Sequence, residues 1–339
     1  MTSKARTLHF ISPKKIEVRE AALPSLREDY VLVETTRSVI SAGTEMLVYR
    51  GQFPNIADMH DGVSSEMNYP LAYGYACVGR VVEIGKAVNG KWLGKLVFAF
   101  HPHSSSFIIH PSTLIPIPES LSDENACFLP NMETAVNLVQ DGAPILGERV
   151  LIFGQGIVGL LTTSLLSEFP LEKLATADLY KLRRNASSEI SGVTSFDSNI
   201  LDFKSEPHVY TQEKFDLTFE LSGSPAALND AIELTTFSGR IIVGSWYGEK
   251  RAEIDLGGTF HRSRIRLISS QVSSISPELS GRWDKTRRFD VAWKALERIK
   301  PEKWVTHRFP IEEADKAYQL LDENPQETLQ VIFEYGKNI

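Results

Sequence analysis

Cysteine is scarce in this 339-residue sequence, which holds only Cys77 and Cys127, in separate contexts. Two such residues make no disulfide framework, so we expect a protein of the reducing cytoplasm. The sequence also lacks an apolar run of about 18 residues and an apolar signal core near its start, so no membrane association is expected. No long run of like charge accompanies the formal net charge of −7. This argues against a nucleic-acid or anionic-membrane partner.

The pattern of apolar and turn-forming residues changes along the chain. Residues 1–120 hold short β-type runs broken by glycine, proline, asparagine and serine, which predicts a β-rich unit. Residues 121–300 begin with a helical segment and then alternate apolar strand runs with helical patterns, which predicts a parallel α/β sheet. Residues 301–339 return to a strand, a helix and a strand. The run WDKTRRFD, residues 283–290, is interpreted most simply as a helix start with charge pairs.

The most specific motif is the G-x-G-x-x-G pattern in VLIFGQGIVGLL, which follows an apolar strand run and begins an apolar helix. Its glycines allow the tight turn, the approach of a pyrophosphate and close helix–strand packing. The N–H groups at the helix N-terminus then face the phosphates. A glycine-rich turn without a nucleotide is the alternative. We expect a dinucleotide to contact the six residues of this turn, Gly154, Gln155, Gly156, Ile157, Val158 and Gly159.

An acidic residue follows the turn at the expected spacing. Asp178 ends the next apolar run, ATAD, about 20 positions after Gly159. Such an acid accepts hydrogen bonds from the ribose hydroxyls of NAD and repels the 2′-phosphate of NADP. Arg183 and its basic neighbours follow closely and could instead hold a 2′-phosphate. The sequence therefore favours NAD as cofactor and leaves NADP as the alternative.

The order of these segments resembles the medium-chain dehydrogenase/reductase superfamily over essentially the full chain. RSVISAGTE, residues 37–45, resembles the segment that ends in a zinc-binding cysteine in the alcohol dehydrogenases, and GYACVGRV, from Gly74, resembles their G-H-E motif. The resemblance implies a GroES-like domain, a Rossmann domain and a cofactor in the cleft between them. It also implies cofactor contacts at the Thr–Ala pair of the entering helix and at two strand ends, through Thr134, Ser222 and Gly244.

Two segments, VISAGTEMLVYRGQFP and YPLAYGYACVGRVV, are similar to a zinc-free branch that includes bacteriochlorophyllide hydroxyethyl dehydrogenases. That narrower resemblance implies a chlorophyll-type substrate. Residues 101–110 and 261–283 do not extend it. We therefore expect a small-molecule substrate without naming it.

The zinc ligands of the alcohol dehydrogenases have no good counterpart here. The resemblance places Ser41 or Ala42, Tyr75 and about Pro130 at the positions of their cysteine, histidine and third ligand. None offers a thiolate or an imidazole, the ligands that zinc prefers. A histidine-rich run at residues 101–110 has no clustered carboxylates to support a new site. We therefore expect no metal.

Without zinc, a protein group must stabilise the developing alkoxide or enolate. Tyr75 stands at the position of the zinc-binding histidine, and its phenol could donate a hydrogen bond to a substrate oxygen. The equal alternative is a packed tyrosine whose hydroxyl fills the space of the missing metal. His103 follows the strand run KLVFAF on a polar loop and could titrate near neutral pH, or it could only anchor the loop. Glu45 lies near the missing cysteine and could be only a structural hydrogen-bonding acid. These three are our candidate catalytic residues.

These features predict a zinc-independent NAD(P)-dependent oxidoreductase that transfers hydride between nicotinamide and an alcohol or carbonyl. An NADPH-dependent quinone or enone reductase is one alternative, although residues 41–44 replace the Asn-Pro signature of that branch. A nucleotide-binding redox sensor without turnover is the other. The run RIRLISSQVSSI would be the last strand of the cofactor sheet. Because that edge commonly pairs across a two-fold axis in the superfamily, we expect a homodimer.

Overall fold

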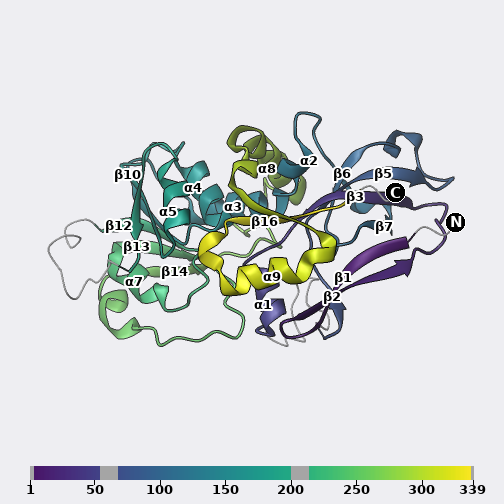
Figure 1. Cartoon of the computed structure of the whole chain (residues 1–339). Helices are drawn as coiled ribbons and strands as arrows, with labels where there is room; N and C mark the ends of the chain where they lie inside the picture. Colours follow the sequence, from purple (N-terminus) through teal and green to yellow (C-terminus); the bar gives the residue numbers. More distant parts are fainter. Residues whose placement is uncertain (1–3, 54–67, 200–213, 337–339) are drawn as a thin grey trace. The chain divides into compact units, whose positions relative to one another are not determined.

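The computed structural model describes residues 4–53, 68–199 and 214–336 (Figure 1). Its contacts divide the chain into two compact units, one of Met1–Pro130 with Leu296–Ile339 and one of Asn131–Ala295. The first unit is β-rich and the second contains a parallel sheet, which confirms the predicted fold class. The naming of these units as catalytic and cofactor domains stays a prediction.

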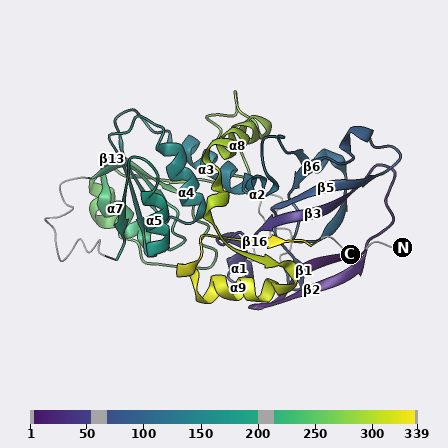
Figure 2. The same cartoon turned by 45° about the horizontal axis from the view of Figure 1, so that its top comes forward.

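Antiparallel strands make up most of the first unit. One sheet has the order β2-β1-β4, and a larger one has the order β15-β16-β3-β5-β6-β8, with β7 also paired to β3. The end of the chain returns to this sheet, because β16 pairs antiparallel with β3 (Figure 2). The strands are β1 (Lys4–Ser12), β2 (Lys15–Ala22), β3 (Val31–Val39), β4 (Leu71–Ala72), β5 (Cys77–Ile84), β6 (Leu96–Ala99), β7 (Ser106–Ile109), β8 (Ile115–Pro116), β15 (Val305–Pro310) and β16 (Gln330–Glu334).

The described part of the first unit contains the helices α1 (Thr44–Arg50), α2 (Asp123–Ala126) and α9 (Ala314–Glu323). The apolar residues of α1 and α9 share one core with β1 and β16, in which Phe10, Tyr318 and Phe333 are fully buried. Five of the seven residues of α1 are buried. This helix therefore encloses its single acidic residue, Glu45, together with its apolar ones.

The second unit is a parallel sheet with the order β11-β10-β9-β12-β13-β14. Its central strands are buried along nearly their whole length, as expected for a sheet covered on both faces. The order reverses between β9 and β12, and ligands of such sheets bind outside the carboxyl ends of the strands at this switch point. The strands are β9 (Arg149–Phe153), β10 (Lys173–Asp178), β11 (Val193–Asp197), β12 (Phe215–Glu220), β13 (Thr235–Val243) and β14 (Arg266–Ser269).

Helices connect these strands. Right-handed crossovers place α4 and α5 on one face of the sheet and α7 on the other, because the chain moves in opposite directions along the sheet before and after β12 (Figure 1). The helices are α3 (Leu129–Gly142), α4 (Ile157–Leu166), α5 (Lys181–Ser188), α7 (Ala227–Leu234) and α8 (Lys285–Ile299). Within the described ranges, no helix has the length and apolar character needed to cross a membrane.

Candidate functional site: a glycine turn and a buried polar cluster

The glycine turn lies between β9 and α4, as its sequence predicts. Gly154 has a φ of 87°, and a Cβ atom there would lie 2.5 Å from the Leu221 carbonyl oxygen. A Cβ atom on Gly159 would collide with the Gly154 carbonyl group. At Gly156 the nearest atom to such a Cβ is 3.9 Å away, and no side chain caps α4 at this residue. The turn therefore offers an open backbone surface at a helix N-terminus, which fits a pyrophosphate.

Asp178 joins the glycine turn to the end of β10. Its Oδ2 accepts the Gln155 N–H at 2.7 Å, and its Oδ1 accepts the Tyr180 N–H at 2.8 Å. The residue is only 6% exposed. A carboxylate has about four acceptor positions, so two remain after these bonds. The acid thus holds the turn in shape and keeps acceptor capacity that suits ribose hydroxyls.

The basic residues after β10 make different contacts. Arg184 binds Asp197 at 2.8 Å and donates to the Asp178 and Leu179 carbonyl groups. The Arg183 guanidinium instead lies 4.8 Å from the centre of the Tyr180 ring. Its Nη1 lies 3.9 Å from the position that a Cβ atom on Gly156 would take. Contact of Arg183 with a cofactor phosphate stays a prediction.

The other expected cofactor residues have visible structural roles. The Ser222 hydroxyl donates to the buried Glu220 carboxylate, which also accepts the Tyr247 hydroxyl at 2.5 Å. A Cβ atom on Gly244 would lie 2.5 Å from a Leu138 methyl group, so this glycine lets α3 pack closely on β13. Thr134 is partly exposed on α3. Cofactor contact by these three residues stays a prediction.

Sequence reasoning missed Glu220, whose side chain is completely buried at the carboxyl end of β12. Burial and the nearby Glu220 charge raise the pKa of Tyr247 far above its usual value. The phenol therefore stays protonated and donates. An acidic residue at the end of an apolar strand run, FDLTFE, was the available signal.

In the first unit, two candidate residues meet inside a group that we call the buried polar cluster: Ser38, Glu45, His103, Tyr318 and Tyr335. Glu45 Oε2 lies 2.9 Å from His103 Nε2 and also accepts the Tyr318 hydroxyl. Ser38 Oγ lies 2.7 Å from His103 Nδ1 and 2.7 Å from the Tyr335 hydroxyl. A carboxylate oxygen accepts hydrogen bonds, so the contact with Glu45 Oε2 assigns the ring proton of His103 to Nε2.

The phenols of this cluster are held in the protonated form. Burial, followed by the Glu45 charge, raises the pKa of Tyr318 well above its usual value. Burial is also the main cause that raises the pKa of Tyr335. Each phenol therefore has a proton to donate within the cluster, and every polar atom of the Glu45 carboxylate is satisfied, as buried polar groups require.

His103 lies on the expected loop between β6 and β7, but its ring is not exposed to solvent. A Cβ atom on Gly74, whose φ is 117°, would lie 2.6 Å from His103 Cδ2. The ring also meets Phe333 edge-on, with 5.1 Å between centroids. The polar run in the sequence is therefore an internal layer, and His103 packs directly on the backbone of the GYA motif.

Tyr75 lies beside this cluster and is partly exposed. Its hydroxyl donates to Ser41 Oγ at 2.5 Å. Ser41 in turn donates its backbone N–H to Glu45 Oε1 at 2.8 Å. Burial, followed by the Glu45 charge, raises the pKa of Tyr75, while hydrogen bonds with Ser41 and Thr44 lower it in part. At neutral pH Tyr75 is therefore a protonated donor linked to the cluster.

The residues at the zinc positions do not fit zinc. Ala42 and Pro130 have no ligand atom, and the Tyr75 phenol is bonded to Ser41. Across residues 4–53, 68–199 and 214–336, no three His, Cys, Asp or Glu side chains gather as a metal site.

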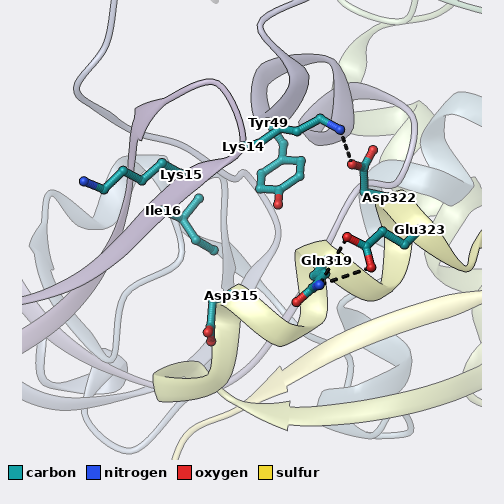
Figure 3. A pocket seen from close by; sticks show the side chains of 8 residues that line it. All are labelled: Lys14, Lys15, Ile16, Tyr49, Asp315, Gln319, Asp322 and Glu323. Atoms are coloured by element: carbon teal, nitrogen blue, oxygen red, sulfur yellow. Dashed lines mark hydrogen bonds and ion pairs between the residues drawn. The ribbon is translucent and has the colours of Figure 1, made fainter.

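A surface hollow of about 360 Å³ also lies in the first unit, between the β1–β2 turn and α9 (Figure 3). Its charged groups are largely paired: Lys14 Nζ lies 2.7 Å from Asp322 Oδ2, and Gln319 donates to Glu323 at 3.1 Å (Figure 3). None of the candidate residues lines it. Its lining residues are Lys14, Lys15, Ile16, Tyr49, Asp315, Gln319, Asp322 and Glu323.

Comparison with known proteins gives distant likenesses. No protein-family model matches the chain. The L-threonine 3-dehydrogenase of Xanthomonas campestris pv. campestris (strain B100) is 22% identical over 345 residues, which cover 91% of this chain and 94% of the relative. At this identity the likeness alone does not assign a substrate.

Solved structures agree with the fold. An alcohol dehydrogenase of Escherichia coli CFT073 complexed with NADH has a TM-score of 0.78 at 18% identity and covers 98% of this chain and 99% of its own. A candidate zinc-binding dehydrogenase of Sinorhizobium meliloti 1021 bound to NADP has a TM-score of 0.75 at 18% identity, with coverage of 98% and 99%. The chain therefore has the alcohol dehydrogenase fold, with its β-rich and Rossmann-type parts. The absence of zinc and the bacteriochlorophyllide resemblance stay predictions.

Proposed function

We propose that this chain is an NAD(P)-dependent oxidoreductase that transfers hydride between nicotinamide and an alcohol or carbonyl substrate without zinc. The observation that carries the proposal is the glycine turn, whose backbone is uncovered at Gly156. The Asp178 carboxylate holds this turn by accepting the Gln155 N–H. The dinucleotide, when bound, supplies or accepts the hydride. The dehydrogenase names of the relatives support the same class of reaction.

Tyr75 supplies the proton in this proposal. During carbonyl reduction the oxygen gains negative charge, and a neutral phenol can donate to it. An alkoxide is a stronger base than a phenolate, so transfer of the proton is favourable even though the pKa of Tyr75 is raised. Ser41 and Thr44 then stabilise the phenolate until solvent returns the proton. In alcohol oxidation the same steps run in reverse.

Glu45 and His103 act as positioning residues, because both side chains are enclosed and cannot touch a substrate. Glu45 fixes the Ser41 backbone, which holds the acceptor of the Tyr75 hydroxyl. His103 packs on Gly74, the residue before Tyr75. The pair thus supports Tyr75 from two directions, as a donor needs a fixed geometry to act in the transition state.

Cofactor choice and assembly belong to the same proposal. Asp178 favours NAD, while Arg183 beside the turn keeps NADP as the alternative. The edge strand β14 has no neighbour on its outer side among the strands that the structure describes. Unpaired edges are usually covered, so we propose that two copies pair through β14 as a homodimer.

The test is steady-state turnover of an alcohol and ketone panel with NAD(H) and NADP(H), on protein whose metal content is determined by elemental analysis. Tyr75→Phe should lower kcat by roughly 10²–10⁴-fold, the range of a lost general acid. Tyr49→Phe, the same change elsewhere in the first unit, should leave kcat unchanged. Turnover that needs stoichiometric zinc would refute the proposal.

Two other outcomes select the alternatives. Reduction of enones or quinones without any alcohol oxidation would identify a C=C reductase. Saturable NADH binding without turnover on either panel would identify a nucleotide-binding sensor. The Tyr75→Phe variant separates these further, because a sensor has no rate for that change to lower.

A further inference from the structure

A fully buried arginine lies in the second unit, where the sequence predicted a helix start with charge pairs. Arg288 is on the first turn of α8, and its side chain is 0% exposed. Its Nε and Nη2 donate to Glu133 Oε1 at 3.1 and 2.9 Å, and its Nη1 donates to Asn137 Oδ1 at 2.5 Å. Both partners are on α3, four residues apart, and therefore on one face of that helix. The helix start was expected, but the burial of Arg288 was not.

The same guanidinium also binds backbone carbonyl groups of the segment after β14, which we call the Ser270–Ser274 segment. Nη1 donates to the Ser274 carbonyl at 3.1 Å, and Nη2 donates to the Val272 carbonyl. Lys285 Nζ donates to the Val272 carbonyl as well, at 2.9 Å. An irregular segment has no sheet partners for such groups, so the arginine supplies the hydrogen bonds that hold its shape.

The start of the segment is fixed from α3. Asn137 Nδ2 donates to Ser270 Oγ at 2.9 Å, and Ser270 Oγ donates to Asp141 Oδ2 at 2.6 Å. Burial raises the pKa of Asp141. Glu133, Asn137 and Asp141 follow one another at four-residue intervals along α3. A continuous polar stripe of α3 thus faces the segment, with Arg288 at one end.

The strand order of the sheet indicates which part of a bound dinucleotide would contact the Ser270–Ser274 segment. The pyrophosphate site is at the end of β9, and Asp178, the expected ribose partner of the adenosine half, ends β10 on one side of it. The nicotinamide half must then extend the other way, across the carboxyl ends of β12, β13 and β14. With strands about 4.8 Å apart, the end of β14 lies roughly 14 Å from that of β9. The Ser270–Ser274 segment begins there.

We propose that Arg288, paired with Glu133, is a positioning residue that holds the Ser270–Ser274 segment in the conformation that receives the nicotinamide half of the cofactor. This deepens the proposed function and rests on it. Burying an arginine is costly unless its bonds are made. Here the bonds go to a segment at the cofactor edge of the sheet, and a purely apolar contact could not hold its carbonyl groups in place.

Calorimetric titration with NADH and with ADP-ribose, which lacks the nicotinamide ring, separates this role from general stability. Arg288→Lys keeps the charge but loses the planar fork of donors. We expect its Kd for NADH to rise at least 10-fold, while its Kd for ADP-ribose stays within about two-fold of wild type. Arg287→Lys, the neighbouring exposed arginine that stacks on Trp283 at 4.2 Å, is the matched control and should change neither value.

A second variant and a measurement on wild type cover the case in which Arg288→Lys does not fold. The double change Glu133→Met with Arg288→Met replaces the ion pair by apolar groups, and it should show the same selective loss of NADH affinity. In wild type, NADH but not ADP-ribose should slow amide hydrogen exchange of peptides covering residues 270–274.

Equal NADH affinity in folded Arg288→Lys, a parallel loss for both ligands, or equal protection of residues 270–274 by both would overturn the positioning role and leave the proposed function standing. If wild type binds neither ligand, the proposed function fails first. The two failures are therefore distinguishable.

Discussion

Glu45 and His103 lie 2.9 Å apart, Oε2 to Nε2, and neither side chain has any exposed surface. The pair connects α1 to the loop before β7 and lies directly behind Gly74 and Tyr75. The resemblance to zinc enzymes places the counterparts of their cysteine and histidine ligands at Ser41 or Ala42 and at Tyr75, beside this pair. A satisfied hydrogen-bond network holds α1 and the loop before β7 together.

Glu45→Gln tests how much that network stabilises the protein. The carboxylate accepts from Ser41, His103 and Tyr318, so an amide NH₂ group would place a donor against a donor. We expect a loss of roughly 2–4 kcal/mol in the free energy of unfolding, measured in urea. Glu17→Gln, an exposed change, should cost less than about 0.5 kcal/mol. A similar small loss at Glu45 would show that the network is not needed.

The pH dependence of stability should contain a contribution from Glu148. Burial alone would raise its pKa, but hydrogen bonds from Arg240, with Nη1 at 2.6 Å and Nη2 at 2.7 Å, together with the Ile145 N–H, lower it below 4.5. The folded-state pKa is thus below the unfolded one. The stabilisation is complete above pH 4.5 and is lost as the pH falls through the folded-state pKa.

Urea unfolding between pH 3 and 7 checks this expectation. The difference in unfolding free energy between wild type and Glu148→Gln should be largest near pH 7 and should shrink below pH 4.5. A difference that stays constant across this pH range would contradict the assignment.

A substitution in the glycine turn should weaken cofactor binding without changing the stability of the fold. A Cβ atom on Gly156 meets nothing closer than 3.9 Å, so Gly156→Ala should fold and melt like wild type. The added methyl group would occupy the surface that the pyrophosphate approaches, and the NADH affinity should fall at least 10-fold. Gly281→Ala, where a Cβ atom meets nothing within 4 Å, is the control for both measurements. Unchanged NADH affinity in Gly156→Ala would place the cofactor elsewhere.

The proposed homodimer depends on the edge of β14. Leu267 on this strand is 42% exposed, and a charge there should oppose pairing with a second copy. Light scattering after size exclusion should give a dimer mass for wild type and a monomer mass for Leu267→Asp. Leu93→Asp, an equally drastic change at a residue that is 55% exposed in the first unit, should remain dimeric. A monomeric wild type would end this part of the proposal.

Local spacing explains which features could be predicted from the sequence. The glycine turn, its strand and helix, and Asp178 follow one another within about 30 residues, and each has a distinctive residue type. The alternation of strands and helices likewise revealed the parallel sheet. Such patterns are set by backbone conformation and by burial along a short piece of chain.

The features that were missed depend on contacts between distant residues. Glu45 and His103 are 58 positions apart, and Glu133 and Arg288 are 155 apart. A charged residue in a polar run looks exposed, and only the packed fold shows that His103 and Arg288 are buried. Their roles follow from partners that no local pattern names. Sequence reasoning therefore offered His103 as a candidate and Arg288 only as part of a helix start with charge pairs.

The central claim is that the chain binds and uses a nicotinamide dinucleotide without zinc. Its most direct test is calorimetric titration with NADH of protein grown with added zinc and then assayed for bound metal by elemental analysis. The account predicts saturable NADH binding, one per chain, with no stoichiometric zinc. Absence of binding, or binding only in protein that holds one zinc per chain, would contradict it.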